Sequence, residues 1–233
     1  MCPNIKISNM TTQEAIIARH SVRRYQEKPI EAEIIKQLNE EIALCNQEGG
    51  LHIQLVTDEP KAFSSKMATY GKFSGVSNYL AMVGPKGADE AIGYYGERLV
   101  LLAQTLGLNS CWVGLSFTRQ PDRYQVPNGE KLHCAISLGY GLNPGVQHPM
   151  RAMEKFVKLN GDGEMPDWFR RGMEAVMLAP TAVNQQKFEF ELVNDHTVAA
   201  RARFTLIGYG QMDLGIAKYH FEVAAGKENF HWQ

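Results

Sequence analysis

The sequence has little of what marks membrane, secreted or nucleic-acid-binding proteins. No apolar run approaches the ~20 residues that a membrane-spanning helix needs, and the first ten residues, MCPNIKISNM, are too polar for a signal peptide. The four cysteines, at positions 2, 45, 111 and 134, form no CxxC pair. The formal net charge of -1 leaves no basic field of the kind that binds a phosphate backbone. We therefore expect a cytoplasmic protein with reduced thiols that binds neither a membrane nor nucleic acid.

Familiar catalytic and metal-binding signatures are also missing. The patterns GxSxG, HExxH and GxxxxGK[ST] are absent, and the glycines of GYGLNPG (139–145) have the wrong spacing for a dinucleotide fingerprint. The seven histidines show no spacing typical of metal ligands. We expect no metal site and assign no catalytic side chain. Either a bound cofactor performs the chemistry, or the protein is not an enzyme.

Hydrophobic periodicity and turn residues predict helices that alternate with strands. Thr11 and Glu14 have the spacing of a capping box, which predicts a short helix ending at about His20. Further helices are expected from Ile30, over 90–106 and 168–178, and within 211–225; strands are expected over 51–56, 79–84, 132–139 and 187–193, and a loop over 142–151. This order predicts a fold that contains both helices and sheet.

Three arginines and a histidine lie within six positions in ARHSVRRYQEKP (18–29). The proline at the end of this stretch disfavours helix before it, so residues 21–28 should be extended, with alternate side chains facing different ways. Arg19, His20, Ser21 and Arg23 supply the guanidinium, ring N–H and hydroxyl donors that suit a phosphate monoester. Taken alone, these residues also fit a solvated charged turn.

Two further stretches stand beside RHSVRRY and the proline that follows it: LGLNSCWVG (106–114) and APTAVNQQKFEF (179–190). Together they resemble the FMN-dependent nitroreductase family. Its pattern is an N-terminal Arg-(Arg/His)-Ser-x-(Arg/Lys), a Pro-Ser-x-x-Asn-x-Gln-Pro-Trp stretch and a later Gly-Leu-x-(Ser/Thr)-Cys-Trp-(Ile/Val)-Gly. The resemblance covers nearly the whole chain. It implies an α+β fold with an antiparallel-rich mixed sheet flanked by helices, an FMN cofactor, NADH or NADPH as electron donor, and a small-molecule acceptor such as a nitro compound or a quinone.

The resemblance also implies roles for individual residues. Arg19, His20 and Ser21 would hold the FMN phosphate and ribityl chain, and Arg23 would reach the pyrimidine edge of the flavin. A backbone N–H can hydrogen-bond flavin N5 without itself titrating, and the resemblance places such amides at Trp112, Val113, Gly114 and Leu115. For the Trp112 side chain, core filling is an equally good interpretation. Arg151 is the nearest match to a basic residue that contacts the phosphate in the family.

The second half of the sequence echoes the first. LHIQLVTD (51–58) is matched by FEFELVND (188–195), and both follow a predicted helix. In the family, the Pro-Ser-x-x-Asn-x-Gln-Pro-Trp stretch belongs to the first half, but here the matching residues are in the second half and lack the final Pro-Trp: Pro180, Thr181, Ala182, Asn184 and Gln186. We therefore predict two pseudo-equivalent halves, 1–150 and 151–233, with the second half standing in for a partner subunit. One chain would then form one FMN site, as a monomer or as a dimer that does not share the flavin.

Two other functions stay open at this stage. A flavin-binding protein without turnover would bind FMN but would not be reduced by either nicotinamide. A flavin-free pseudo-enzyme that binds a protein partner would fit if Lys187 and the absent Pro-Trp have closed the pocket. The sequence names neither the physiological acceptor nor the preferred nicotinamide.

Overall fold

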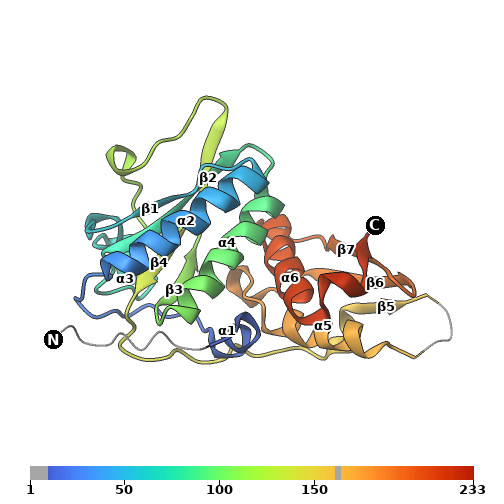
Figure 1. Cartoon of the computed structure of the whole chain (residues 1–233). Helices are drawn as coiled ribbons and strands as arrows, with labels where there is room; N and C mark the ends of the chain where they lie inside the picture. The colour runs from blue at the N-terminus through green and yellow to red at the C-terminus, as the bar shows by residue number, and fades with distance from the viewer. Residues whose placement is uncertain (1–9, 161–163) are drawn as a thin grey trace. The chain divides into compact units, whose positions relative to one another are not determined.

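The computed structural model describes residues 10–160 and 164–233, so the N-terminal segment with Cys2 lies outside the described residues. The chain divides into two compact units (Figure 1). Unit 1 contains the residues up to Gly84 together with Leu99–Val146, and unit 2 contains Pro85–Arg98 and Gln147–Gln233. The sequence placed a single boundary near residue 150, whereas the structure groups residues 85–98 with the second unit.

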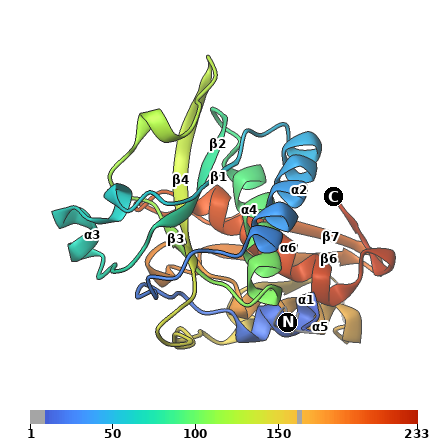
Figure 2. The ribbon, with the colours of Figure 1, turned by 60° about the vertical axis from the view of Figure 1, so that its left-hand side comes forward.

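Unit 1 is built on a four-stranded sheet in the order β1-β2-β4-β3. Its strands are β1 (Gln54–Val56), β2 (Asn78–Pro85), β3 (Asn109–Val113) and β4 (Glu130–Gly139), and the β1–β2 and β3–β4 pairs are antiparallel. The helices are α1 (Thr12–Ala18), α2 (Ala32–Gly49) and α3 (Lys66–Tyr70), with the 3-10 turns Lys61–Phe63 and Pro121–Arg123. Figure 2 shows α2 on one side of the strands and α3 on the other.

Local sequence signals account for much of unit 1. The predicted capping box at α1 is confirmed, because the Thr11 side chain accepts from the Glu14 backbone and the Glu14 carboxylate accepts from the Thr11 backbone. The strand predicted over 51–56 begins only at Gln54. The side chain of Asn46 bonds both the N–H and the carbonyl of Ile53, at 2.7 and 2.9 Å. These backbone groups are therefore satisfied by a helix side chain instead of a strand ladder.

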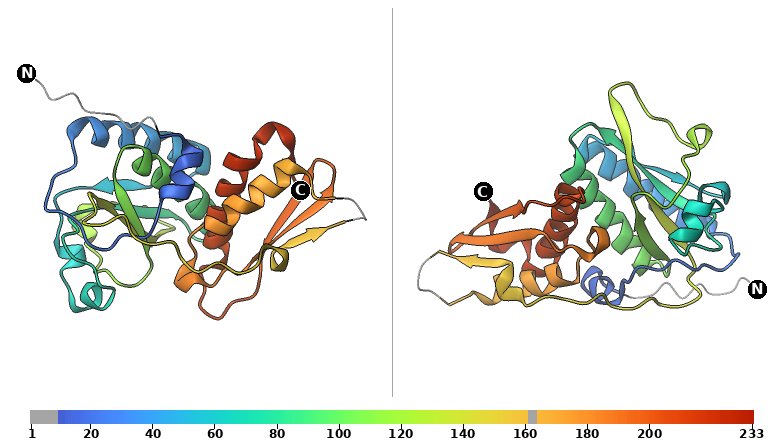
Figure 3. Two further views of the ribbon diagram at one scale, coloured as in Figure 1. Left: turned by 90° about the horizontal axis from the view of Figure 1, so that it is seen from below. Right: turned by 180° about the vertical axis from the view of Figure 1, so that it is seen from behind.

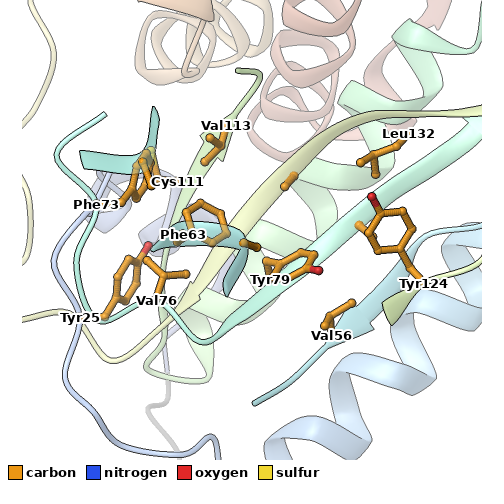
Figure 4. Close-up of a cluster of buried hydrophobic side chains, with 14 of the residues drawn as sticks. Tyr25, Val56, Phe63, Phe73, Val76, Tyr79, Cys111, Val113, Tyr124 and Leu132 are labelled. Atoms are coloured by element: carbon orange, nitrogen blue, oxygen red, sulfur yellow. The ribbon is translucent and has the colours of Figure 1, made fainter. Parts of the chain in front are cut away.

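Aromatic and β-branched side chains fill the core of unit 1 between the sheet and the segment that carries α3. Figure 4 shows Tyr25, Phe63, Phe73 and Tyr79 gathered there with Cys111 of β3. The ring centroids of Phe63 and Phe73 are 5.2 Å apart. Two stretches far apart in the sequence, around Tyr25 and around Cys111, are thus held together by one buried cluster.

Unit 2 has a mixed sheet in the order β5-β6-β7-β8, so the predicted α+β class is confirmed with one sheet in each unit. The strands are β5 (Val157–Leu159), β6 (Phe188–Asn194), β7 (Thr197–Ala202) and β8 (His231–Trp232); β6 and β7 are antiparallel, and the other two pairs are parallel. Helices α5 (Asp167–Leu178) and α6 (Gly210–Ala225) lie side by side next to this sheet (Figure 3). Helix α4 (Asp89–Thr105) begins in unit 2 and ends in unit 1.

Candidate functional site

The arginine cluster lies on an extended segment of unit 1, as the following proline predicts. Its backbone bonds three neighbours: Val22 N–H donates to Ser110 at 3.0 Å, Tyr25 N–H to Ser74 at 3.0 Å, and Gln26 N–H to Tyr140 at 2.8 Å. Val22 and Tyr25 point into the core, whereas Arg23 and Arg24 are exposed. Buried apolar side chains therefore fix the segment and leave Arg23 and Arg24 at the surface, whereas Arg19 is buried.

Three of the predicted flavin-binding residues lie near Cys111 of β3. Burial raises the pKa of the Cys111 thiol, while the positive charges of Arg23 and Arg19 and a hydrogen bond from Ser21 act in the opposite direction. These electrostatic effects require Arg19, Ser21 and Arg23 to lie close to the thiol. The structure thus brings the N-terminal cluster to the middle of the NSCWVG stretch, about 90 residues away in the sequence.

His20 completes the cluster as a neutral donor. Burial lowers the pKa of its imidazole, and the positive charge of Arg19 lowers it further, so the ring is uncharged at neutral pH. A Cβ atom at Gly145 would lie 2.7 Å from the Cβ of His20, and Leu142 N–H donates to the Arg24 carbonyl at 2.9 Å. The loop over 142–145 therefore packs against the cluster.

The four residues predicted to lie beneath the flavin ring follow from Cys111 along β3. Trp112 is half-buried and Val113, the last residue of β3, is buried. Gly114 and Leu115 continue beyond the strand, and the Leu115 side chain is 72% exposed. The turn at Gly114 and Leu115 lies at the surface directly after β3, near the cations of the arginine cluster. Its backbone N–H groups could therefore bond a planar ligand.

The remaining predicted site residues gather in unit 2. The Gln186 side chain donates to the Pro149 carbonyl at 3.0 Å and accepts from Arg151 N–H at 3.2 Å, and the Asn184 side chain donates to the same Pro149 carbonyl at 2.9 Å. Thr181 Oγ1 accepts from Gln186 N–H at 3.1 Å. The turn after Pro180 and Ala182 is therefore bonded to the segment that carries Arg151, through Asn184 and Gln186.

Asp213 is a residue of this region that sequence reasoning missed. It is buried in the first turn of α6, and its carboxylate accepts from Ala182 N–H at 2.9 Å and from Gln185 Nε2 at 2.6 Å. Burial raises the Asp213 pKa to about 6, although both hydrogen bonds favour the charged form. An acid inside the apolar run MDLGIA is the signal that could have identified it.

Within residues 10–160 and 164–233, no group of three or more His, Cys, Asp or Glu side chains is placed to hold a metal ion. Over the same ranges, no helix has the length and apolar character to cross a membrane. Cys45, Cys111 and Cys134 are buried and form no disulfide.

Comparison with known proteins gives one family and several solved structures. A family model described as "Putative TM nitroreductase" matches residues 11–225. The crystal structure of a putative nitroreductase from Thermotoga maritima is 21% identical, covers 92% of this chain and 83% of its own, and has a TM-score of 0.63. The NfrA1 nitroreductase of B. subtilis is 15% identical over 63% of this chain and 73% of its own, with a TM-score of 0.50.

A putative nitroreductase from Desulfovibrio desulfuricans, solved in complex with FMN, is 16% identical over 66% of this chain and 98% of its own, with a TM-score of 0.49. A search of the curated proteins gives no match.

Proposed function

The chain belongs to this nitroreductase family of oxidoreductases, and from that premise we propose that it is an FMN-dependent NAD(P)H oxidoreductase. The acceptor would be a nitro compound, a quinone or a similar small molecule. FMN supplies the electron transfer when bound, because flavins accept a hydride and pass electrons on. The chain's own residues bind the cofactor and orient it.

One observation carries the proposal: the segment that bears Arg19, Ser21 and Arg23 is bridged to β3 beside Cys111, with Ser21 paired to Ser110 and Val22 N–H donating to the Ser110 carbonyl at 3.0 Å. A phosphate needs cationic and hydroxyl donors, and a flavin ring needs backbone donors close to them. The cluster and the turn at Gly114 meet both needs within unit 1. The residues present therefore fit the cofactor that the motifs imply.

Each donor has a role that follows from its surroundings. Arg19 is only 3% exposed, so its guanidinium is held in place and loses little freedom on binding an anion. Neutral His20 and Ser21 add uncharged donors. Arg23 is exposed and is assigned to the pyrimidine edge, where its charge would stabilise electron density on N1 and O2. The N–H groups at Trp112, Val113, Gly114 and Leu115 are assigned to N5 and O4.

The contribution of unit 2 stays a prediction. Arg151, Pro180, Thr181, Ala182 and Asn184 are proposed to complete the flavin site of the same chain. The Asn184 and Gln186 side chains both donate to the Pro149 carbonyl, so in this assignment they also shape the turn that presents Thr181 and the backbone to the cofactor.

Three variants test the assignment of the cluster. Arg19→Ala should weaken FMN binding by roughly ten- to a hundredfold, because a charge-assisted contact is worth about 1.5–3 kcal/mol. It should barely affect riboflavin, which lacks the phosphate. Arg23→Ala should weaken both ligands. Arg24→Ala, the matched control, removes the same charge one residue away and should affect neither. Quenching of flavin fluorescence on titration gives the dissociation constants.

FMN binding by Arg19→Ala equal to that of the wild type would remove the cluster from the phosphate site. A purified protein that is colourless and does not bind added FMN would favour the partner-binding function. A yellow protein that neither NADH nor NADPH reduces would be a flavin-binding protein without turnover.

Initial rates at several acceptor concentrations should give parallel double-reciprocal lines, as expected when one product leaves before the next substrate enters.

A further inference from the structure

A second ligand surface lies beside the proposed flavin site. Residues 60–77, PKAFSSKMATYGKFSGVS, form one segment of unit 1 that includes α3; we call it the α3 segment. Phe63, Phe73 and Val76 anchor it in the core (Figure 4). Phe63 also stacks on Phe117, with the ring centroids 6.2 Å apart. The segment is therefore a fixed part of unit 1.

The α3 segment contacts both parts of the proposed flavin site. On one side, Ser74 N–H donates to the Arg23 carbonyl at 3.0 Å. On the other side, Thr118 N–H donates to the Ala62 carbonyl at 2.8 Å, and a Cβ at Gly71 would lie 2.6 Å from the Cβ of Ser116. A molecule that reaches the turn at Gly114 is thus next to this segment.

The outward side chains of these two stretches carry only positive charge. Residues 60–77 and 114–121 contain Lys61, Lys66, Lys72 and Arg119 but no acidic residue, and all four cations are exposed. Two acids border these stretches: Glu59, which is buried and accepts from the backbone N–H groups at 61 and 62 at 3.0 and 2.9 Å, and Asp122, which is exposed and precedes the exposed Arg123.

Several lysines in other parts of the described chain are paired with acids. Five of them form ion pairs with glutamates: Lys28, Lys36, Lys158, Lys218 and Lys227. Among the described residues, none of the four cations of the α3 segment and the 114–121 stretch has an acidic partner within ion-pair distance. Their charge is therefore available to an anionic ligand.

One further feature points to a ligand rather than to a solvated face. The Tyr70 side chain is 84% exposed at the end of α3, four residues after Lys66, and so lies on the same side of the helix. Lys72 caps the end of α3: its left-handed backbone, with φ of 62°, forms a Schellman cap in which Lys72 N–H donates to the Thr69 carbonyl at 2.9 Å and Phe73 N–H to the Ala68 carbonyl at 3.0 Å. An exposed aromatic ring between two lysines suits a phosphorylated aromatic molecule.

We propose that the α3 segment binds the adenosine-phosphate half of the reduced nicotinamide dinucleotide, with Tyr70 stacked on the adenine and Lys66, Lys72 and Arg119 on the phosphates. The inference rests on the proposed function, because that function supplies the dinucleotide as electron donor. The nicotinamide half would extend to the turn at Gly114. No covalent step is involved; the segment sets affinity for the donor.

The test compares the dinucleotide donors, NADH and NADPH, with a mononucleotide donor that carries the same nicotinamide. The Lys66→Gln, Lys72→Gln double variant should raise the KM for NADH and NADPH about fivefold with kcat unchanged, because exposed pairs each contribute about 0.5 kcal/mol. Reduced nicotinamide mononucleotide lacks the adenosine phosphate, so its KM should stay the same. Lys36→Gln, on α2 of the same unit, is the control and should change neither KM. Tyr70→Ala should act like the double variant, and Tyr70→Phe should restore the wild-type KM because it keeps the ring.

Calorimetry with adenosine 2′,5′-bisphosphate separates this inference from the proposed function, because its binding needs neither flavin nor turnover. Lysine-dependent binding of the bisphosphate would support the surface even if neither nicotinamide reduces the protein. An unchanged KM for both dinucleotides in an active double variant would overturn the inference and leave the proposed function standing. An equal rise for the mononucleotide would also overturn it, since the lysines would then act at the nicotinamide end.

Discussion

Asp213 is a single residue on which two loops of unit 2 depend. Its carboxylate holds Ala182 N–H and the Gln185 side chain, and Gln185 in turn donates to the Gly208 carbonyl at 3.0 Å and accepts from the Thr205 hydroxyl. The loop over 180–186 and the loop before α6 are therefore joined through one buried acid. A buried acid that holds two loops should make unit 2 sensitive to pH near its pKa.

The Asp213 pKa of about 6 lies above its ordinary value of 3.8, so between these pH values the folded chain binds a proton that the unfolded chain has lost. The free energy of unfolding should then fall as pH rises from about 4 to 7, by up to about 3 kcal/mol from this residue. Asp213→Asn cannot titrate and should lose this slope. Urea unfolding followed by tryptophan fluorescence, with Trp168 and Trp232 in unit 2, measures the difference between the two proteins at each pH.

Asp167→Asn is the control for this experiment, because the Asp167 side chain is 91% exposed and its removal should leave the slope unchanged. Parallel pH curves for the wild type and Asp213→Asn would show that the buried carboxyl is not perturbed.

At the scale of elements, unit 2 depends on a close crossing between the first turns of α4 and helix α6. Gly93 of α4 faces the Met212 carbonyl of α6, and Gly215 of α6 faces the Glu90 carbonyl of α4; a Cβ at either glycine would collide with backbone. Lys218 and Glu90 form an ion pair across the same crossing at 2.6 Å. Glycine is needed at both positions because only a residue without a Cβ permits this approach.

Gly93→Ala and Gly215→Ala should each destabilise unit 2 by about 3 kcal/mol or more, although alanine is the better helix former by about 1 kcal/mol. The collision outweighs the gain in helix propensity because the added Cβ meets backbone atoms, which cannot rotate away. Gln211→Ala, at an exposed position of the same helix, should change stability by less than about 0.5 kcal/mol. Thermal unfolding of the three variants checks this order of stability. An unchanged midpoint of thermal unfolding in Gly93→Ala would show that α4 and α6 can separate at no cost.

At the scale of the whole molecule, the arginine cluster belongs to unit 1 and the turn over 180–186 to unit 2. The sequence predicts that both serve one flavin site of the same chain. Covalent linkage favours this arrangement, because a short connection holds a second binding element at an effective concentration of roughly millimolar. We therefore expect one FMN for each chain and no exchange of site residues between chains.

Mixing two variants with weakened FMN binding tests this expectation. Chains with Arg19→Ala are combined with chains that carry both Thr181→Ala and Asn184→Ala, and FMN binding is titrated before and after mixing. If each site belongs to one chain, mixing should restore no tight binding. Recovery of wild-type affinity in part of the sites would show that two chains share each flavin site.

By itself, the sequence determined the features that depend on residues close together in the chain. The capping box of Thr11 and Glu14, the periodicity of α2, α4 and α5, and the extended course of residues 21–25 are confirmed because caps, apolar stripes and proline act over a few positions. The three family motifs are also local patterns, and they led to the correct family.

Tertiary structure alone decided what depends on residues far apart. The Asn46 side chain bonds the backbone of Ile53, so residues 51–53 are not part of β1. Arg19 and Arg23 lie near Cys111 because the buried cluster around Tyr25 holds the two segments together. The Asp213 carboxylate reaches the turn over 180–186 only because α6 packs against that turn. Each outcome depends on burial and on hydrogen bonds between segments that no local pattern connects, because long-range contacts form only when the whole unit has packed. The sheet of unit 2 shows the same division: alternation in the sequence predicted β6, but its parallel pairing with β5, which sets Val157 opposite Phe190, joins two segments separated by α5 and is seen only in the structure.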